Sequence, residues 1–412
     1  MIREQLKEAK KACRFMQNVK PEVKNKALKN ISEALIQKSE LIIQENQKDI
    51  AEAKNNGIKE SMVDRLLLNK ERIESMAKDI LKVIDLQDPI RTLVREIKRP
   101  NGLVIQQIKI PLGVIGVFGI IYEARPNVTV DIASLCLKSG NACVLRGGKE
   151  AIHSNRILVQ IINEAIQDVL PAHTVTLIET KKREETLDLI QAHDYVDVII
   201  PRGSEGLIQY VVKNATVPVI ETGAGICHLY VDQEANLDMA LEIAKNAKIQ
   251  RPSVCNAIET ILVHQKVAPE FLPKLQEIFK NVQIYGDEKT RKIIDCLEAT
   301  EKNYATEYDD YICNIKVVDD IEEAIEHIYN YSTKHSESII TENKETAKYF
   351  MESLDSACVY HNASTRFSDG GEFGFGAEVG ISTQKLHARG PLGLQEITST
   401  KYMIYGNGQV RS

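Results

Sequence analysis

The feature that most constrains the fold is a repeated alternation of short Val/Ile-rich runs with longer amphipathic stretches. From Pro111 onward we predict strands at GVIGVFGII, ACVLR, TVTLIE, VDVIIP and VPVIE. Several of them are separated by predicted helices such as SNRILVQIINEAIQDVL and REETLDLIQAHD. Nearly continuous apolar strands between amphipathic helices are typical of a parallel sheet that is covered on both faces. The pattern therefore predicts an α/β fold.

The same alternation starts again after about Tyr230. Here the predicted strands are AIETILV, CNIKVV, ESIIT and ACVYHN, and helices such as LDMALEIAKNAKI and IEEAIEHIYNY lie between them. A chain of 412 residues is too long for one ordinary core, so two or three domains are expected. We therefore predict a first α/β unit over residues 112–228 and a second one over residues 229–365.

Residues 1–91 read as a helical region that belongs to the first unit. Within it, SEALIQKSELIIQENQKDIAEAKNNG predicts a helix that starts at Ser32 and stops at Asn55-Asn56-Gly57. Residues 92–111 alternate around Pro100-Asn101-Gly102, which is a strong hairpin signal. We expect this hairpin and residues 395–412 to pair with another subunit. The glycine-rich residues 366–394 are predicted to be a loop that returns to the first unit.

Composition excludes several classes of protein. The net charge is −6 with no long basic block, which argues against a nucleic-acid partner. No apolar run approaches 20 residues, and the charged N-terminus lacks the apolar core of a signal peptide, so we expect no membrane span and a cytoplasmic protein. The eight cysteines form no C-x-x-C pair and no zinc-like spacing with histidine, so no metal is predicted. Each cysteine taken alone is more often a packed thiol than a reactive one.

Two strand ends carry groups that suit phosphate, because ligands of open α/β sheets bind at the carboxyl ends of the strands. Arg146-Gly147-Gly148-Lys149 combines two cations with bare backbone, although a glycine turn with solvated charges is an equal alternative. Arg202-Gly203-Ser204 precedes a predicted helix, where free N–H groups favour an anion; simple capping by Ser204 is the alternative. Neither stretch matches the G-x-G-x-x-G fingerprint.

The order of several motifs resembles that of the aldehyde dehydrogenase superfamily over nearly the whole chain. They are PLGVIGVFG, GNACVLRGGKEA, PRGSEG, VIETGAG, Cys255, EYDDY and EFGFGAEVG. Longer strings are similar to one branch of that superfamily, whose members reduce glutamyl phosphate. These strings are YEARPNVTVD, QRPSVCNAIET, AIEHIYNYSTKHSESI, NASTRF and QKLHARGPLGL.

The resemblance implies a fold with two Rossmann-like parallel-sheet domains and an oligomerisation hairpin. It makes residues 1–91 and 112–228 an NADP-binding domain, and residues 229–365 a catalytic domain. The implied reaction is the NADPH-dependent reduction of L-glutamyl 5-phosphate to L-glutamate 5-semialdehyde with release of phosphate, the second step of proline biosynthesis from glutamate.

In this interpretation Cys255 is the nucleophile that displaces phosphate and forms a thioester. The tetrahedral oxyanion needs hydrogen-bond donors. The resemblance supplies the backbone N–H of the cysteine and an asparagine side chain, for which Asn127 is the candidate. The loop before it differs from the usual pattern, and Arg125 is an alternative there that would hold the substrate's phosphate or carboxylate.

The resemblance also assigns cofactor residues. Arg146 stands where the superfamily often has a ribose-binding lysine, and Lys149 where NAD-preferring members have an acid; both changes favour NADPH, whose 2′-phosphate wants a cation. Glu307 matches the glutamate that binds the nicotinamide ribose, with an acid in a charged loop as the alternative. The remaining cofactor candidates are Gly147, Gly148, Gly203 and Ser204.

Substrate binding is expected from polar residues near the C-terminus, since glutamyl phosphate is anionic at both ends. The candidates are Asn362, Ser364, Thr365, Arg366, Lys385, His387 and Arg389. For the last three, a solvated basic loop is an equal alternative.

Two other functions remain open from the residues alone. Glu221 occupies the place of the general base of hydrolytic aldehyde dehydrogenases, which supports a hydrolytic, NAD(P)⁺-dependent enzyme as an alternative. A strand-end acid that caps the next loop is the simpler interpretation of Glu221. A non-catalytic protein on the same fold is a third possibility, and the intact Cys255 motif argues against it.

As partners we expect a small-molecule substrate and other copies of the chain. Glutamyl phosphate cyclises readily in the chemistry of this branch. This instability is a physical motive for transient contact with glutamate 5-kinase, which makes it.

Overall fold

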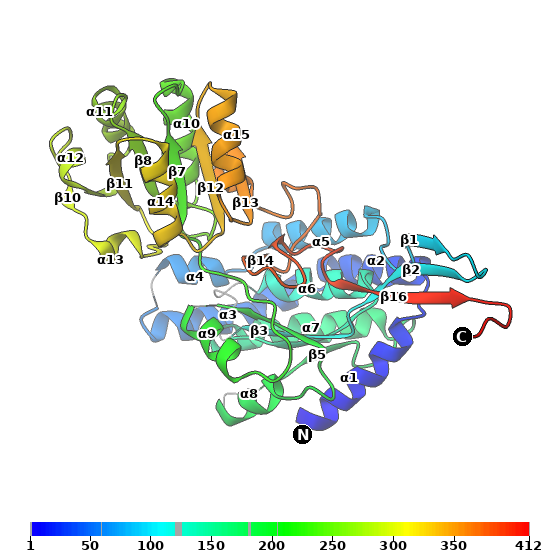
Figure 1. Cartoon of the computed structure of the whole chain (residues 1–412). Helices are drawn as coiled ribbons and strands as arrows, with labels where there is room; N and C mark the ends of the chain where they lie inside the picture. The colour runs from blue at the N-terminus through cyan, green and yellow to red at the C-terminus, as the bar shows by residue number, and fades with distance from the viewer. Residues whose placement is uncertain (1, 59, 120–125, 180–182, 204, 412) are drawn as a thin grey trace.

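The computed structural model describes residues 2–58, 60–119, 126–179, 183–203 and 205–411. The chain forms two α/β units, one above the other in Figure 1, and a separate three-stranded sheet that projects from them. Each unit is built on a parallel sheet, so the predicted α/β fold with two parallel-sheet units is confirmed.

The sheet of the first unit is parallel, with strand order β5-β4-β3-β6. Its strands are β3 (Val114–Gly119), β4 (Ala142–Arg146), β5 (Val175–Leu177) and β6 (Val198–Arg202). Alternate residues of β4 face opposite sides: Ala142 and Val144 pack into one buried cluster, Cys143 and Leu145 into another. The predicted strand VPVIE is wrong, because this run contributes only an isolated bridge between Val219 and Ile199.

Helices cover both faces of this sheet. One face is covered by α1 (Ile2–Met16), α8 (Arg183–Ile190) and α9 (Glu205–Asn214). The other is covered by α6 (Asn127–Lys138), the short helix η1 (Lys149–Ala151) and α7 (Ile152–Ile166). Outside α6 and α7 lie α2 (Pro21–Gln37), α3 (Ser39–Asn55), α4 (Glu60–Leu66) and α5 (Lys70–Asp85).

The predicted helix start at Ser32 is also wrong. Ser32 is buried in the middle of α2 and donates a hydrogen bond to the Ala77 carbonyl of α5 at 2.9 Å. A serine that reads as a helix cap is here satisfied by a neighbouring helix. The predicted stop is confirmed, since α3 ends at Asn55 and Gly57 adopts a φ of +67°.

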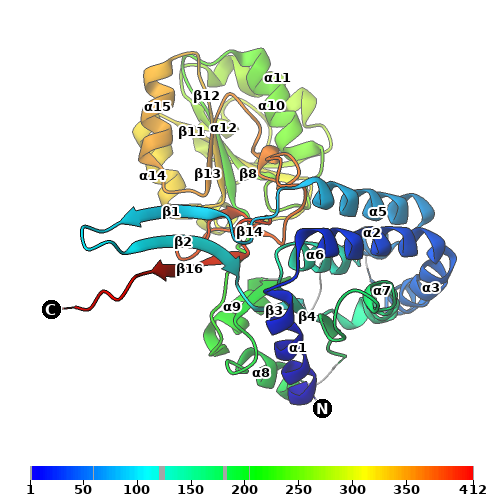
Figure 2. The ribbon, with the colours of Figure 1, turned by 90° about the vertical axis from the view of Figure 1, so that its right-hand side faces the viewer.

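The second unit contains a parallel sheet with strand order β10-β9-β11-β8-β7-β12-β13. Its strands are β7 (Cys227–Val231), β8 (Ile258–His264), β9 (Gln283–Gly286), β10 (Leu297–Glu298), β11 (Ile312–Val318), β12 (Ser336–Ile340) and β13 (Cys358–His361). Figure 2 shows α10 and α11 on one face and α14 and α15 on the other. The helices of this unit are α10 (Leu237–Ile249), α11 (Ala268–Ile278), α12 (Glu288–Arg291), α13 (Glu301–Tyr304), α14 (Ile321–Tyr331), α15 (Lys344–Ser353) and η2 (Thr365–Phe367).

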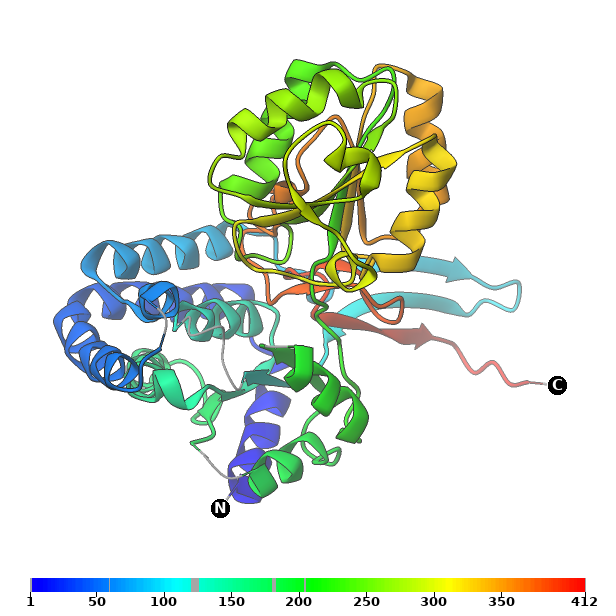
Figure 3. The ribbon, with the colours of Figure 1, turned by 90° about the vertical axis from the view of Figure 1, so that its left-hand side faces the viewer.

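The predicted hairpin is confirmed as β1 (Leu93–Lys98) and β2 (Val104–Pro111), which are antiparallel. Gly102 in the turn has a φ of +88°, a conformation that glycine adopts without strain. The C-terminal strand β16 (Thr398–Tyr405) pairs with the other edge of β2. The resulting sheet stands away from both units (Figures 2 and 3). Its pairing with another subunit stays a prediction.

The segment between β13 and β16 runs along the junction of the two units (Figure 3). It contains the short strands β14 (Ile381–Ser382) and β15 (Gly390–Pro391), and Ser382 forms a bridge with Thr222 of the first unit. Leu392 and Ile397 are buried in the core of that unit. The segment therefore brings residues from beyond the second unit to the seam between the sheets.

A search of the described residues for helices of the length and apolarity needed to cross a membrane finds none.

Candidate active site

A cavity of about 640 Å³ lies at the seam between the two units, and Cys255 is on its wall. Cys255 is half-buried in the turn that joins the C-terminal end of α10 to β8. The other walls come from the first unit, from the loop after α13 and from the segment after β13. The remaining lining residues are Arg65, Arg202, Gly203, Ile208, Thr222, Gly223, Ala224, Arg251, Val254, Asn256, Ala305, Thr306, Glu307, Asp309, Arg366, Asp369, Glu378 and Ile381.

Close backbone packing sets the position of Cys255. A Cβ atom added to Gly225 would lie 1.5 Å from the carbonyl oxygen of Cys255, so only glycine allows this approach. The buried Cys227 thiol donates to the same oxygen at 3.3 Å. The loop Gly223–Gly225 therefore packs directly against the turn that contains Cys255. In the sequence this loop is recognisable only as a glycine-rich strand end.

Three further contacts hold the Cys255 turn in place. Lys248 of α10 and Glu259 of β8 form an ion pair at 2.8 Å, and both side chains are almost fully buried. Because α10 and β8 flank the Cys255 turn, this pair joins the two elements that present the cysteine. On the other side, Thr365 donates to the Asn256 carbonyl at 2.7 Å, and the Asn256 amide donates to the Ser368 carbonyl at 3.0 Å.

Four arginines line the cavity, namely Arg65, Arg202, Arg251 and Arg366. Arg366 donates to the Asn256 side chain and to Gln250. Burial, and then the neighbouring charge of Arg251, lower the pKa of Arg366. This concentration of guanidinium groups favours an anionic ligand next to Cys255.

Glu378 is an acid on the wall of this cavity with an altered proton affinity. Burial raises the pKa of Glu378; Arg202 and the Gly370 N–H oppose this rise and the charge of Asp369 adds to it, and the resulting pKa is about 7. The Gly370 N–H donates to the Glu378 carboxylate at 2.8 Å. A carboxyl group with such a pKa can hold or release a proton near neutral pH.

The described candidate cofactor residues of the first unit lie at the C-terminal edge of its sheet. Arg146 ends β4 and is 7% exposed, Gly147 and Gly148 follow it, and the exposed Lys149 begins η1. Gly203 follows β6 at the same edge and lines the Cys255 cavity. Ser204 lies outside the described residues.

Glu307 enters the Cys255 cavity from the second unit. Its carboxylate accepts a hydrogen bond from the Gly225 N–H at 2.6 Å. It therefore contacts the same loop that supports the cysteine turn.

Of the candidate substrate residues within the described part of the chain, only Arg366 lies on the wall of this cavity. Thr365 supports Asn256, and the Ser364 side chain caps the short helix η2. The Asn362 side chain hydrogen-bonds the backbone of Thr341.

The basic run near residue 387 makes structural contacts. Lys385 and Arg389 form ion pairs with Asp355 at 2.9 and 2.7 Å. His387 contacts the Glu396 carbonyl. The hydrogen bond from Arg389, and then that from Lys385, hold the pKa of Asp355 well below its usual range.

Asn127 and Glu221 do not line the Cys255 cavity. The Asn127 amide donates to Asp131 at 3.1 Å and lines an adjoining pocket. The Glu221 carboxylate accepts a long 3.4 Å hydrogen bond from Gln209 of α9. Arg125 lies outside the described residues.

The charged residues at or beside the site that sequence reasoning missed include Arg65, Arg251, Asp131 and Glu378. Arg251 and Asp131 lie inside strings that matched the glutamyl phosphate branch, which is the signal that would have found them. Nothing in the amphipathic stretch around Arg65 distinguishes it from a solvated helix residue.

A half-buried cysteine lies at the seam of two parallel-sheet units, beside a glycine loop and an acid from the second unit, and this arrangement fits the aldehyde dehydrogenase class. The model of the aldehyde dehydrogenase family matches residues 1–294. The chain belongs to this family.

More similar relatives identify a narrower group within this family. The gamma-glutamyl phosphate reductase of Clostridium novyi is 54% identical over 98% of this chain and 97% of its own. The crystal structure of gamma-glutamyl phosphate reductase from Thermotoga maritima is 48% identical, covers 99% of each chain and has a TM-score of 0.95. These relatives place the chain among the gamma-glutamyl phosphate reductases. An engineered glycolyl-CoA reductase with bound NADP⁺, 16% identical with a TM-score of 0.71 over 98% of this chain and 96% of its own, shares the fold.

Proposed function

We propose that this protein reduces L-glutamyl 5-phosphate to L-glutamate 5-semialdehyde with NADPH and releases phosphate. The observation that carries the proposal is the cavity that places Cys255 among four arginines. An acyl phosphate brings an electrophilic carbon and a multiply charged leaving group to the same place, and this cavity offers a nucleophile and cations together. Full-length similarity to gamma-glutamyl phosphate reductases supports the same substrate.

In the proposed reaction the Cys255 sulfur attacks C5 of the acyl phosphate, and the C5–O bond to phosphate breaks. Arg202 and Arg366 stabilise the departing phosphate, and Cys255 is left as a thioester. A nicotinamide cofactor, held by the residues at the edge of the first sheet, would supply the hydride that reduces the thioester carbon. Collapse of the resulting thiohemiacetal then releases the aldehyde and regenerates the cysteine. We propose that the Cys255 backbone N–H and the Asn127 side-chain amide donate hydrogen bonds to the oxyanion. The Asn127 amide must first rotate away from Asp131, to which it donates in this structure.

Hydrolysis of the thioester is the side reaction that a reductase must suppress. Glu221 stands at the sequence position of a hydrolytic base, but its carboxylate lies beside Gln209 and not on the wall of the Cys255 cavity. The location of Glu221 supports the reductase over the hydrolytic alternative.

The residues at the edge of the first sheet fit a nicotinamide dinucleotide, a cofactor type that family membership also supports. Gly147 and Gly148 follow the end of β4, and Gly203 follows the end of β6; bare backbone at the carboxyl ends of parallel strands suits phosphate groups. We propose NADPH, with Arg146 and Lys149 facing the 2′-phosphate, Ser204 near the pyrophosphate and Glu307 at the nicotinamide ribose.

Lys149→Glu is expected to lower the preference for NADPH over NADH by about tenfold, equivalent to ~1.4 kcal/mol, because an acid repels the 2′-phosphate. The measurement is the ratio of kcat/KM for the two cofactors. Lys26→Glu, an exposed charge change on α2, is the control and should leave the ratio unchanged. An unchanged ratio in Lys149→Glu contradicts the role assigned to Lys149.

For the substrate we propose that Arg366 binds it directly. The other candidates, Asn362, Ser364, Thr365, Lys385, His387 and Arg389, then hold in place the segments on either side of the cavity. Arg125 stays a proposed ligand of the phosphate or carboxylate.

The domain assignments from the sequence are likewise proposed: an NADP-binding domain of residues 1–91 and 112–228, a catalytic domain of residues 229–365, and a connecting loop of residues 366–394. We further propose that the protein is cytoplasmic and oligomerises through the sheet β1-β2-β16. Transient contact with glutamate 5-kinase would protect the unstable substrate.

The reverse reaction tests the proposed function. With glutamate 5-semialdehyde and NADP⁺, NADPH is expected to appear only when inorganic phosphate or arsenate is added, because the thioester is released by phosphate and not by water. NADPH formation is followed by its absorbance, with chloride at matched ionic strength as the control. An equal rate without phosphate or arsenate overturns the proposal in favour of a hydrolytic enzyme.

A further inference from the structure

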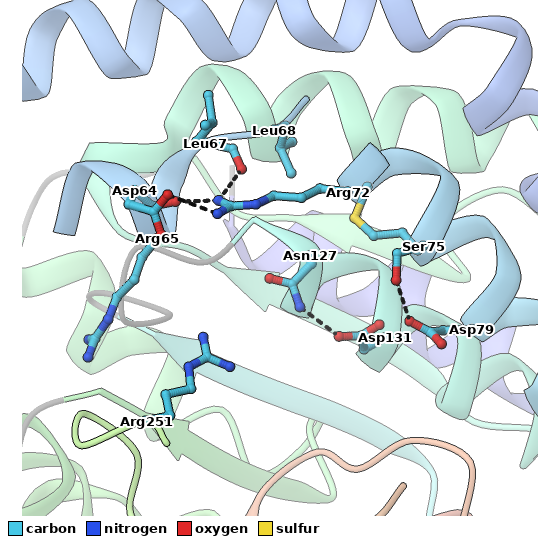
Figure 4. Close-up of a pocket in the computed structure, with 11 residues that line it drawn as sticks. Asp64, Arg65, Leu67, Leu68, Arg72, Ser75, Asp79, Asn127, Asp131 and Arg251 are labelled. Carbon is cyan, nitrogen blue, oxygen red and sulfur yellow. Dashed lines mark hydrogen bonds and ion pairs between the residues drawn. The ribbon is translucent and has the colours of Figure 1, made fainter. Parts of the chain in front are cut away.

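A second pocket, of about 240 Å³, adjoins the Cys255 cavity and shares two residues with it, Arg65 and Arg251. It lies between α4, α5 and the start of α6 (Figure 4). The rest of its wall is formed by Asp64, Leu67, Leu68, Arg72, Ser75, Met76, Asp79, Asn127 and Asp131. The two shared arginines make this pocket an extension of the cavity that holds Cys255.

Opposite charges stand at the two ends of the pocket. Figure 4 shows Asp79 and Asp131 on the side away from Arg65, with Asn127 between. Burial raises the pKa of Asp131, the Asn127 hydrogen bond partly opposes this rise, and the charge of Asp79 adds to it; the resulting pKa is about 7. No cation among the described residues forms an ion pair with Asp131, so its carboxylate is matched only by the Asn127 amide.

The arginines of the pocket differ in the hydrogen bonds and ion pairs that they already form within the protein. Arg72 donates to Asp64 at 2.9 Å and to the Leu67 carbonyl, also at 2.9 Å. Arg65 donates to the Ser253 carbonyl at 3.0 Å. Within the described part of the chain, Arg251 makes neither a hydrogen bond nor an ion pair, and Figure 4 shows its guanidinium pointing into the pocket.

We propose that this pocket binds the α-amino-acid end of the substrate, with Asp131 receiving the α-ammonium group and Arg251 the α-carboxylate. The inference rests on the proposed function, because it places C5 of the same substrate at Cys255. An ammonium group supplies the cation that Asp131 lacks, and a carboxylate pairs with a guanidinium that has no other partner in the described chain. The protein then selects acyl phosphates of amino acids with a free α-amine.

The test compares two aldehydes in the reverse reaction with NADP⁺ and phosphate. They are glutamate 5-semialdehyde and 5-oxopentanoate, which has the same chain and carboxylate but no amine. The wild-type kcat/KM is expected to be about 10- to 100-fold higher for glutamate 5-semialdehyde than for 5-oxopentanoate. This factor corresponds to the free energy of a charge-assisted hydrogen bond. Asp131→Asn is expected to remove most of this preference, and Asp131→Glu to keep part of it. Glu71→Gln, which removes an exposed carboxylate of α5 outside the pocket, is the control.

A second arm tests the carboxylate. Arg251→Met is expected to lower the preference for 5-oxopentanoate over pentanal, which lacks the carboxylate, by a similar factor. If Arg251→Met instead raises only the KM for phosphate, Arg251 serves the leaving group and its proposed role is overturned.

Other results separate this inference from the proposed function. A parallel loss of activity on both aldehydes in Asp131→Asn shows that Asp131 is structural, and an unchanged preference shows that the amine binds elsewhere; either result overturns the inference. If Asp131→Asn does not fold, a wild type without preference for the amine overturns it equally. A wild type that forms NADPH from neither aldehyde, or without needing phosphate, contradicts the proposed function instead.

Discussion

Cys255→Ala is expected to abolish turnover, with kcat falling by roughly 10⁶-fold, the scale on which removal of a nucleophile acts. The physical reason is that no thioester forms without the sulfur, and hydride transfer to the acyl phosphate would then have to occur in one difficult step. The variant is expected to fold, because Cys255 is half-buried in a turn and its main chain, held by Cys227 and Gly225, is unchanged.

Turnover in both directions and NADPH binding by fluorescence check this prediction. Cys296→Ala is the matched control, because Cys296 is also half-buried in the second unit but is not on the wall of the cavity. It is expected to retain full activity. If Cys255→Ala keeps more than about 1% of wild-type turnover, Cys255 is not the nucleophile.

Lys248→Met is expected to lower the free energy of unfolding by about 3–5 kcal/mol, because it leaves the Glu259 carboxylate buried without its partner. The Lys248 side chain is 0% and that of Glu259 1% exposed, so water cannot replace the lost contact. The double change Lys248→Met with Glu259→Leu is expected to recover most of the loss, since replacing both members of a buried pair by apolar residues is often neutral.

Urea unfolding, read from the transition of the second unit, measures this effect. The control is Lys274→Met, which breaks an ion pair with Glu270 of the same 2.8 Å length on the exposed face of α11. It is expected to cost less than about 1 kcal/mol. If the two variants lose the same free energy of unfolding, burial of the Lys248–Glu259 pair contributes nothing to stability.

Much of the fold could be predicted from the sequence because strand and helix periodicity is a local property. The runs ACVLR and VDVIIP appear as β4 and β6, and the Asn101-Gly102 turn joins β1 to β2. The failures are also local signals that distant residues overrode. Ser32 resembles a helix cap, but α5 supplies its hydrogen-bond partner, and VPVIE resembles a strand but has only an isolated bridge to β6.

The candidate site was predicted in part. The motif around Cys255 is contiguous, so the sequence alone predicted the nucleophile, and the structure puts Cys255 on the wall of the cavity of about 640 Å³ between the two units. Lys385 and Arg389 form an equally suggestive basic run, yet they bind Asp355. A charge in a sequence has no partner until the chain is folded, so such a run cannot be assigned to a ligand or to an ion pair beforehand.

The sequence by itself determined the two parallel-sheet units, the hairpin and the choice of Cys255 as the candidate nucleophile, because each is encoded within a short stretch of chain. Only the tertiary structure decided which charges surround that cysteine. Arg65 from α4, Asp131 from α6 and Arg251 from beyond α10 meet beside one seam although they are widely separated along the chain. Their convergence follows from the packing of helices against two sheets, which buries some charges in pairs and leaves others facing a cavity.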